Sequence, residues 1–123
     1  LVSVNQHKDL ALCFTQRDHL GEVIQAVGRY YFIEATNAAE VAFVIRESQR
    51  SKGMATTLLL QMIEIARQRK LAKLVACVRR DNAPMLKVFE NAGFVRGYSE
   101  ELDEIALTLT LTEDQQNNNK DIP

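Results

Sequence analysis

The centre of the chain carries the stretch Arg50-Ser51-Lys52-Gly53-Met54-Ala55, between the apolar run Val41-Ala42-Phe43-Val44-Ile45 and an amphipathic segment that starts at Thr56. A glycine turn with two cations is expected to open a helix there. The first amides of a helix have no intrahelical acceptors, and the aligned peptide dipoles place partial positive charge at that end. We therefore expect this junction to bind an anion, most simply a phosphate group.

The segments on either side of this turn predict a strand, a helix and a second strand. The apolar residues between 56 and 69 recur at helical spacing; they are Leu58, Leu59, Met62, Ile63, Ile65 and Ala66. Unbroken apolar runs within 40–46 and 71–80 are typical of strands covered on both faces. This order predicts a right-handed crossover between two neighbouring parallel strands.

Antiparallel elements are expected at both ends of this unit. Residues 7–15 and 22–33 read as a hairpin around the polar turn at 16–21. Asp81-Asn82-Ala83-Pro84 predicts a helix start, and Gly93 its end. The last strand pair is expected at 94–97 and 105–112. The polar, low-complexity residues 114–123 predict a disordered tail.

Composition indicates one domain, over residues 1–113, in a chain of 123 residues with 46% apolar and 25% charged residues. A formal charge of -1 gives no general attraction to nucleic acid or anionic lipid, so the expected partner is a small anion. No apolar run approaches the roughly 18 residues of a membrane span. Cys13 and Cys77 lie in apolar runs without metal-ligand spacing, which predicts reduced core thiols, no metal and a cytoplasmic setting.

The phosphate turn lacks the glycine spacing of a Walker loop or a dinucleotide fingerprint. It resembles the loop Gln/Arg-x-x-Gly-x-Gly/Ala of the GNAT superfamily of acyl-CoA-dependent N-acetyltransferases, with Arg50, Gly53 and Ala55 at the matching positions. The motifs at 80–86 and 89–94, Arg-Asp-Asn-Ala-Pro-Met-Leu and Phe-Glu-Asn-Ala-Gly-Phe, follow at a family-like distance. Within the superfamily, the strand at 39–43 looks most like bacterial protein-lysine acetyltransferase domains.

The resemblance implies an α/β (α+β) fold with a mixed, mostly antiparallel sheet and helices on both faces. The strands at 40–46 and 71–80 are expected to splay apart around the cofactor arm. The N-terminal strand and helices of the family are expected to be lacking, which suggests a fragment, a fused upstream domain or a homo-oligomer.

The implied co-substrate is acetyl-CoA, without a metal. Its pantetheine arm is expected to pair with backbone groups near Val44, Ile45 and Arg46, and its diphosphate to lie on the amides of the turn beside Arg50; these are Ser51, Lys52, Gly53, Met54, Ala55 and Thr56. Asn82 and Phe89 match positions that face the cofactor arm. The alternative for Arg50 and Lys52 is a solvated pair of cations, and the alternative for Gly53 is an ordinary loop glycine. For Asn82 it is a plain helix N-cap.

Glu40 is the candidate base, because an ammonium of pKa ~10 must lose a proton before it attacks a thioester. Desolvation beside Val41 and Phe43 is expected to raise its carboxyl pKa. The alternative is a surface charge, and the competing Glu47 is expected to be solvated. Phe89 stands where many members carry a tyrosine that protonates the leaving thiolate. Here solvent, Cys13 or Tyr98 is expected to supply that proton, or the thiolate leaves without an acid.

The sequence thus predicts an acyl-CoA-dependent N-acetyltransferase that acts on a primary amine, either a protein lysine or a small amine. The acidic loop at 100–104 is expected to attract cationic amines or to be a solvated turn. The alternative from another class is a non-catalytic acyl-CoA-binding sensor or regulatory module, and a third is a structural domain with a degenerate loop. The residues do not identify the acceptor or the acyl chain length.

Overall fold

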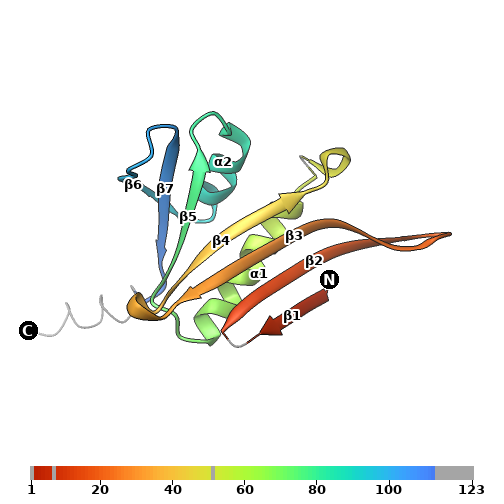
Figure 1. The fold of residues 1–123 in the computed structure, drawn as a ribbon, viewed down its shortest axis with the longest axis horizontal. Coiled ribbons are helices and arrows are strands. Elements are labelled where there is room, and N and C mark those ends of the chain that lie inside the picture. The colour runs from red at the N-terminus through yellow and green to blue at the C-terminus, as the bar shows by residue number, and fades with distance from the viewer. Residues whose placement is uncertain (1, 7, 51, 113–123) are drawn as a thin grey trace, which may run out of the picture.

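A computed structural model describes residues 2–6, 8–50 and 52–112, and side chains from residue 8 onward (Figure 1). Seven strands form one sheet in the order β1-β2-β3-β4-β5-β7-β6. The strands are β1 Val2–Gln6, β2 Asp9–Asp18, β3 Gly21–Ile33, β4 Ala38–Ile45, β5 Lys73–Arg79, β6 Val95–Gly97 and β7 Glu104–Thr110. The helices are α1 Met54–Gln68 and α2 Ala83–Asn91, with short 3-10 helices η1 Glu34–Thr36 and η2 Glu47–Gln49. The predicted α/β fold with a mixed, mostly antiparallel sheet is confirmed.

The first four strands form an antiparallel meander. The predicted hairpin is confirmed, with a tighter turn than expected, because the strands continue to Asp18 and resume at Gly21. The Asp18 carboxylate accepts a 2.7 Å hydrogen bond from the Leu20 amide inside that turn. The expectation that the N-terminal strand is lacking is wrong, since Val2–Gln6 pairs antiparallel with β2. This five-residue strand carries little sequence signal and depends on the edge that β2 offers.

The predicted parallel pair is confirmed, and it splays. Three residues of β4 pair with β5: Ala38 with Lys73, Ala39 with Leu74 and Glu40 with Val75. Beyond these pairs β4 runs on to Ile45 and β5 to Arg79 in diverging directions, as Figure 1 shows. A gap in the backbone pairing therefore opens on one side of β4.

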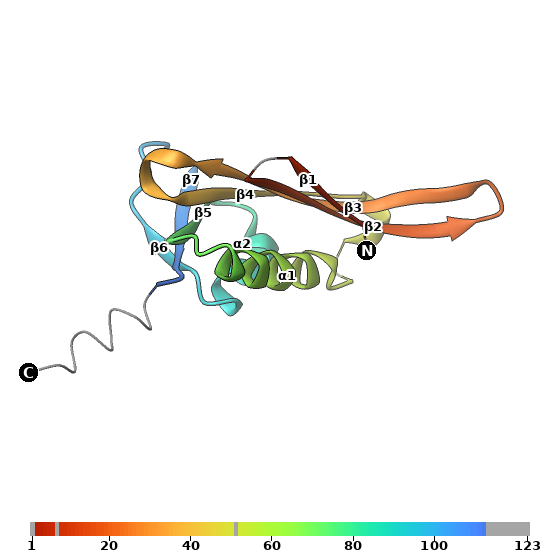
Figure 2. The same cartoon turned by 90° about the horizontal axis from the view of Figure 1, so that it is seen from below.

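Both helices lie on the same face of the sheet, so the expectation of helices on both faces is not met in the described chain (Figure 2). The α1 side chains that turn toward the sheet are Leu58, Leu59, Met62, Ile63 and Ala66, as predicted from their spacing. On β4, Val41 is buried on the face that the helices cover, whereas Ala42 and Val44 are exposed on the opposite face. An apolar run cannot reveal by itself which face a strand leaves uncovered.

The two cysteines are free, but they are not both core residues. Cys13 is half-buried, and Cys77 is exposed on the face without helices. The strand period explains the error at Cys77, because its neighbours Ala76 and Val78 point into the core. The predicted tail at 114–123 lies outside the described residues.

Gly28 provides a test of how closely α1 packs under the sheet. A Cβ at this position would lie 3.0 Å from the Met62 side chain and 3.0 Å from the Phe43 ring. Gly28→Ala is expected to destabilise the fold by about 1 to 3 kcal/mol, because the packed side chains must shift. Thermal unfolding measures this, with Gly97→Ala as the control, since its Cβ would meet nothing within 4 Å. Equal melting temperatures for the two variants would contradict this packing.

Candidate functional site

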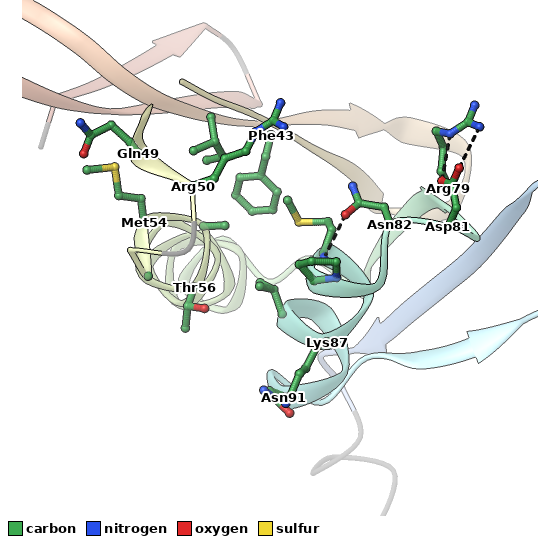
Figure 3. Close-up of a pocket in the computed structure, with 16 residues that line it drawn as sticks. Phe43, Gln49, Arg50, Met54, Thr56, Arg79, Asp81, Asn82, Lys87 and Asn91 are labelled. Atoms are coloured by element: carbon green, nitrogen blue, oxygen red, sulfur yellow. Dashed lines mark hydrogen bonds and ion pairs between the residues drawn. The ribbon is translucent and has the colours of Figure 1, made fainter. Parts of the chain in front are cut away.

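A cleft of about 790 Å³ opens where β4 leaves β5 (Figure 3). Three segments form its walls: the end of β4 with the loop that follows, the first turn of α1, and the junction from β5 into α2. Its lining residues are Phe43, Ile45, Gln49, Arg50, Gly53, Met54, Ala55, Thr56, Arg79, Asp81, Asn82, Pro84, Met85, Lys87, Val88 and Asn91. The cleft thus brings together both motifs that the sequence singled out.

The first turn of α1 presents backbone amides to this cleft. Gly53 is the N-cap residue, in the left-handed conformation with φ 80°, and no side chain caps the helix. Intrahelical pairing begins with the Thr57 amide, which donates to the Gly53 carbonyl at 3.1 Å. The amides of Met54, Ala55 and Thr56 precede this bond, and no acidic side chain lies in the first turn. Their donors are therefore available to an anion.

The free edge of β4 supplies a second set of backbone groups. The Arg46 amide donates to the Gln25 carbonyl at 2.8 Å, which makes this a hydrogen-bonded antiparallel pair. Alternation along β3 and β4 then turns the N–H and C=O groups of Val44 toward β3 as well. Those of Phe43 and Ile45 point the other way, into the gap beyond the last pair with β5. The residues suited to hold a linear amide chain are thus Phe43 and Ile45.

The structure gathers most of the predicted cofactor residues around the cleft, but not all. Ile45, Arg50, Gly53, Met54, Ala55, Thr56 and Asn82 line it. Arg46 and Lys52 are exposed and Val44 faces the other side of the sheet, and none of these three is a lining residue. Ser51 lies outside the described residues.

Asn82 combines the two roles that the sequence left open. Its side-chain carbonyl accepts a hydrogen bond from the Met85 amide at 3.4 Å and so caps α2. The same side chain lines the cleft (Figure 3). Because the cap uses the amide oxygen, the side-chain NH₂ group remains as a donor toward the cleft.

Phe89 lies beneath the cleft and does not line it. It is only 2% exposed and packs between Phe43 and Phe94, with ring centroids 5.7 Å and 4.9 Å away. It therefore supports the wall that Phe43 presents to the cleft. Of the two other residues that could supply an acid, Tyr98 is 87% exposed and Cys13 lies on β2, and neither lines the cleft.

Sequence reasoning missed Arg79 and Asp81, which also line the cleft. The Arg79 guanidinium donates to both carboxylate oxygens of Asp81, at 3.2 and 3.3 Å. This hydrogen bond raises the pKa of Arg79 and lowers that of Asp81. Their place at the carboxyl end of a strand that splays from its neighbour was the available signal, since ligands in open α/β sheets bind beside such ends.

Glu40 is the last β4 residue paired with β5, and it does not line the cleft. Its exposed side chain lies on the face without helices, so Val41 does not bury it as expected, because alternate strand residues face opposite sides. The Cys77 thiol has a raised pKa, first from partial burial and then from the nearby carboxylates of Glu104 and Glu40. Glu40 and Glu104 therefore both lie near Cys77 on the open face, where Arg29 of β3, opposite Ala42, is also exposed.

Among residues 8–50 and 52–112, no three His, Cys, Asp or Glu side chains come together in a way that would hold a metal ion. No helix in the described part of the chain has both the length and the apolar character needed to span a membrane.

Comparison with known proteins gives the cleft its context. Residues 3–95 match the model of the acetyltransferase (GNAT) domain. The GNAT domain of S. lividans PAT has a similar structure, with a TM-score of 0.69, 25% identity, and coverage of 86% of this chain and 64% of that one. The Salmonella typhimurium protein yncA, solved with its cofactor acetyl-CoA, is similar with a TM-score of 0.63 and 20% identity. The match covers 72% of this chain and 59% of that one. No curated protein matched.

A third similar structure is the ribosomal-protein-alanine N-acetyltransferase of Brucella melitensis, with a TM-score of 0.70, 20% identity, and coverage of 84% of this chain and 69% of that one. The chain spans less than two thirds of the S. lividans and Salmonella typhimurium chains.

Gly53 offers a test of the anion site. A Cβ there would meet nothing within 4 Å, so Gly53→Ala adds only the strain of φ +80°, and its methyl group would stand in the cleft. We expect the Kd for CoA, measured by isothermal titration calorimetry, to rise by about tenfold, or about 1.4 kcal/mol.

The control is Gly21→Ala at the β2–β3 turn, which has a similar open environment and φ +123°. It is expected to leave the Kd unchanged. A Gly53→Ala variant that binds CoA as tightly as Gly21→Ala would show that the first turn of α1 does not hold the anion.

Proposed function

This chain belongs to the GNAT acetyltransferase domain family, and on that premise we propose that it moves an acetyl group from acetyl-CoA to a primary amine by direct attack. The observation that supports this most is the meeting of two sets of backbone groups in one cleft. The amides at the start of α1 suit a diphosphate, and the free edge of β4 at Phe43 and Ile45 suits the amides of pantetheine.

The remaining lining residues fit the same molecule. Arg50 and Lys87 add positive charge near the nucleotide end of the cleft, and the Asn82 NH₂ group can donate to a pantetheine carbonyl. Gly53 and Ala55 keep the wall beside the diphosphate free of bulky side chains. When bound, acetyl-CoA supplies a thioester whose carbonyl carbon accepts the amine.

The reaction forms a C–N bond and breaks the C–S bond. The ammonium loses one proton to become the attacking amine and a second proton as the amide forms, while the thiolate gains one, so that one proton is released to solvent. We assign the first proton to Glu40, directly or through water, because it stands where β4 and β5 separate and faces the side from which an amine can approach. The backbone N–H of Phe43, which also points into the gap and lies nearer to Glu40 along β4, is suited to stabilise the oxyanion, and the Ile45 N–H remains for pantetheine. The thiolate takes its proton from solvent, since a thiol of pKa ~8.5 leaves without strong assistance.

The acceptor is a cationic amine in this proposal, either a protein lysine or a small amine, and the setting is cytoplasmic. Glu40 and Glu104 flank Cys77 on the open face and offer two carboxylates to an approaching ammonium group. The likeness to the PAT domain favours a protein lysine, and a panel of lysine peptides and polyamines would decide between the two.

A non-catalytic acyl-CoA-binding module is the second candidate. It is favoured by Phe89, which has no proton to donate and is buried where a tyrosine would act. It is also favoured by the exposed face of β4, which has no described segment to hold an acceptor. Both candidates require acetyl-CoA binding, and only the first requires amine-dependent release of CoA thiol.

Glu40→Gln tests the proposal. We expect kcat, measured as CoA thiol released in the presence of a lysine peptide, to fall by about 100-fold or more, because a general base is lost. The Kd for acetyl-CoA should stay the same, since Glu40 does not line the cleft. Glu22→Gln, an exposed carboxylate at the β2–β3 turn, is the matched control and should keep full activity.

Full activity of Glu40→Gln would remove the base assignment. Tight acetyl-CoA binding by the unmodified chain without release in the presence of any amine would instead favour the non-catalytic module.

A further inference from the structure

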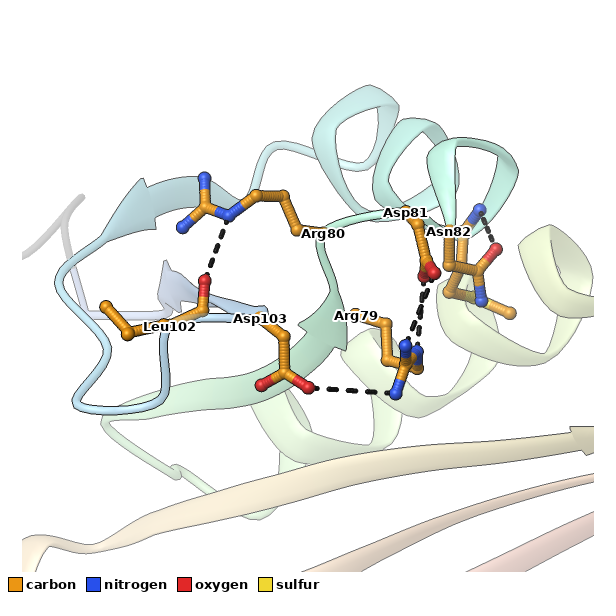
Figure 4. A network of polar contacts seen from close by, with 7 residues as sticks. Arg79, Arg80, Asp81, Asn82, Leu102 and Asp103 are labelled. Carbon is orange, nitrogen blue, oxygen red and sulfur yellow. Dashed lines mark hydrogen bonds and ion pairs between the residues drawn. The ribbon is translucent and has the colours of Figure 1, made fainter.

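Arg79 connects two segments that are distant in the sequence (Figure 4). Its guanidinium donates two hydrogen bonds to Asp81, at the start of the turn into α2. The same group forms an ion pair with Asp103, 3.8 Å away, in the connection between β6 and β7. One side chain at the end of β5 therefore contacts both the junction into α2 and the 98–103 connection.

The next residue anchors the backbone of that connection. The Arg80 amide donates to the Asp103 carbonyl at 2.7 Å, and its guanidinium donates to the Leu102 carbonyl at 3.3 Å. These bonds hold the connection against the end of β5. The contact between this connection and the start of α2 is made by the Arg79 side chain.

The two segments joined by Arg79 border opposite sides of the proposed reaction. Asp81 lines the cleft and directly precedes Asn82, the cap of α2. Asp103 directly precedes Glu104, whose carboxylate lies close enough to the Cys77 thiol and to Arg79 to influence both. The first segment belongs to the cofactor side, and the second borders the open face where Glu40 stands.

The ion pairs of Arg79 are expected to affect the geometry of the site more than the stability of the fold. Arg79, Asp81 and Asp103 are largely exposed, and exposed ion pairs contribute little to folding. A planar guanidinium bonded to both oxygens of a carboxylate nevertheless fixes orientation in a way that a point charge does not. Without Arg79, the carboxylates of Asp81, Asp103 and Glu104 would have no shared cation and would repel one another.

We propose that Arg79 is a positioning residue that holds the 98–103 connection in register with the cofactor cleft, so that the amine meets the thioester. This inference rests on the proposed function and extends it to how the two substrates are aligned. Asp103 and Asp81 are the groups through which Arg79 acts.

The kinetic test compares Arg79→Gln with Arg96→Gln. Arg96 forms an exposed two-bonded ion pair with Glu90, at 2.9 Å, away from the cleft, so its loss is a matched control. Arg79→Gln is expected to raise the amine KM or lower kcat by about tenfold or more, because misplaced reactants lose rate steeply. The Tm should stay close to that of Arg96→Gln, and the loss in amine kinetics should exceed any loss of acetyl-CoA affinity that follows from the place of Arg79 in the cleft lining.

Arg79→Lys separates alignment from charge. It keeps the cation and loses the paired hydrogen bonds, so it should recover only part of the lost activity. Full recovery in Arg79→Lys, or amine kinetics of Arg79→Gln equal to those of Arg96→Gln, would overturn the proposal. An equal loss of acetyl-CoA affinity and amine kinetics would also overturn it, since that result indicates a damaged cleft.

Hydrogen–deuterium exchange tests the link without turnover. In the unmodified chain, CoA binding should slow exchange both in the first turn of α1 and at residues 99–104. In Arg79→Gln the first response should remain and the second should be lost. If residues 99–104 respond to CoA equally in both proteins, Arg79 does not connect the two sides. This arm holds even if the chain proves to be a non-catalytic binder, so a failure of the proposed function remains distinguishable.

Discussion

The separation of β4 from β5 is the constraint on which the rest of the structure depends. Parallel pairing joins only Ala38 to Glu40 with their partners, and then the two strands diverge. Every buried backbone donor and acceptor needs a partner, so a strand that loses its neighbour must find a substitute in water or in a ligand. The cleft exists because β4 continues to Ile45, beyond Glu40, its last residue paired with β5. The backbone N–H and C=O groups of Phe43 and Ile45 point into the gap that this leaves.

The packing of the two helices turns this gap into a site. Gly28 lets the Met62 side chain and the Phe43 ring approach β3, which brings α1 close under the sheet. The start of α1 then lies beside the end of β4, and α2 closes the opposite wall through the contact of Phe89 with Phe43. Because both helices lie on one face, the cofactor is expected from that side and the acceptor from the other.

Much of this arrangement could be predicted from the sequence, for local reasons. Gly53 between an apolar strand and an amphipathic helix predicts a helix start with free amides, and Pro84 after Asn82 predicts the second helix start. The faces of the sheet could not be predicted in the same way. The run around Phe43 is apolar on both sides, and only the tertiary structure shows that Val44 is exposed and that Glu40 shares its face. The Arg79 network was also out of reach, because its partner Asp103 lies far along the chain.

The most direct test of the account is residue-resolved amide NMR of the chain titrated with CoA. The N–H resonances of Ala55, Thr56 and Ile45 are expected to shift and to become protected from exchange, because these groups donate to the ligand. The N–H of Val44 should change little, since it already faces β3. Saturable CoA binding that protects none of these three amides, or that protects Val44 in place of Ile45, would contradict it.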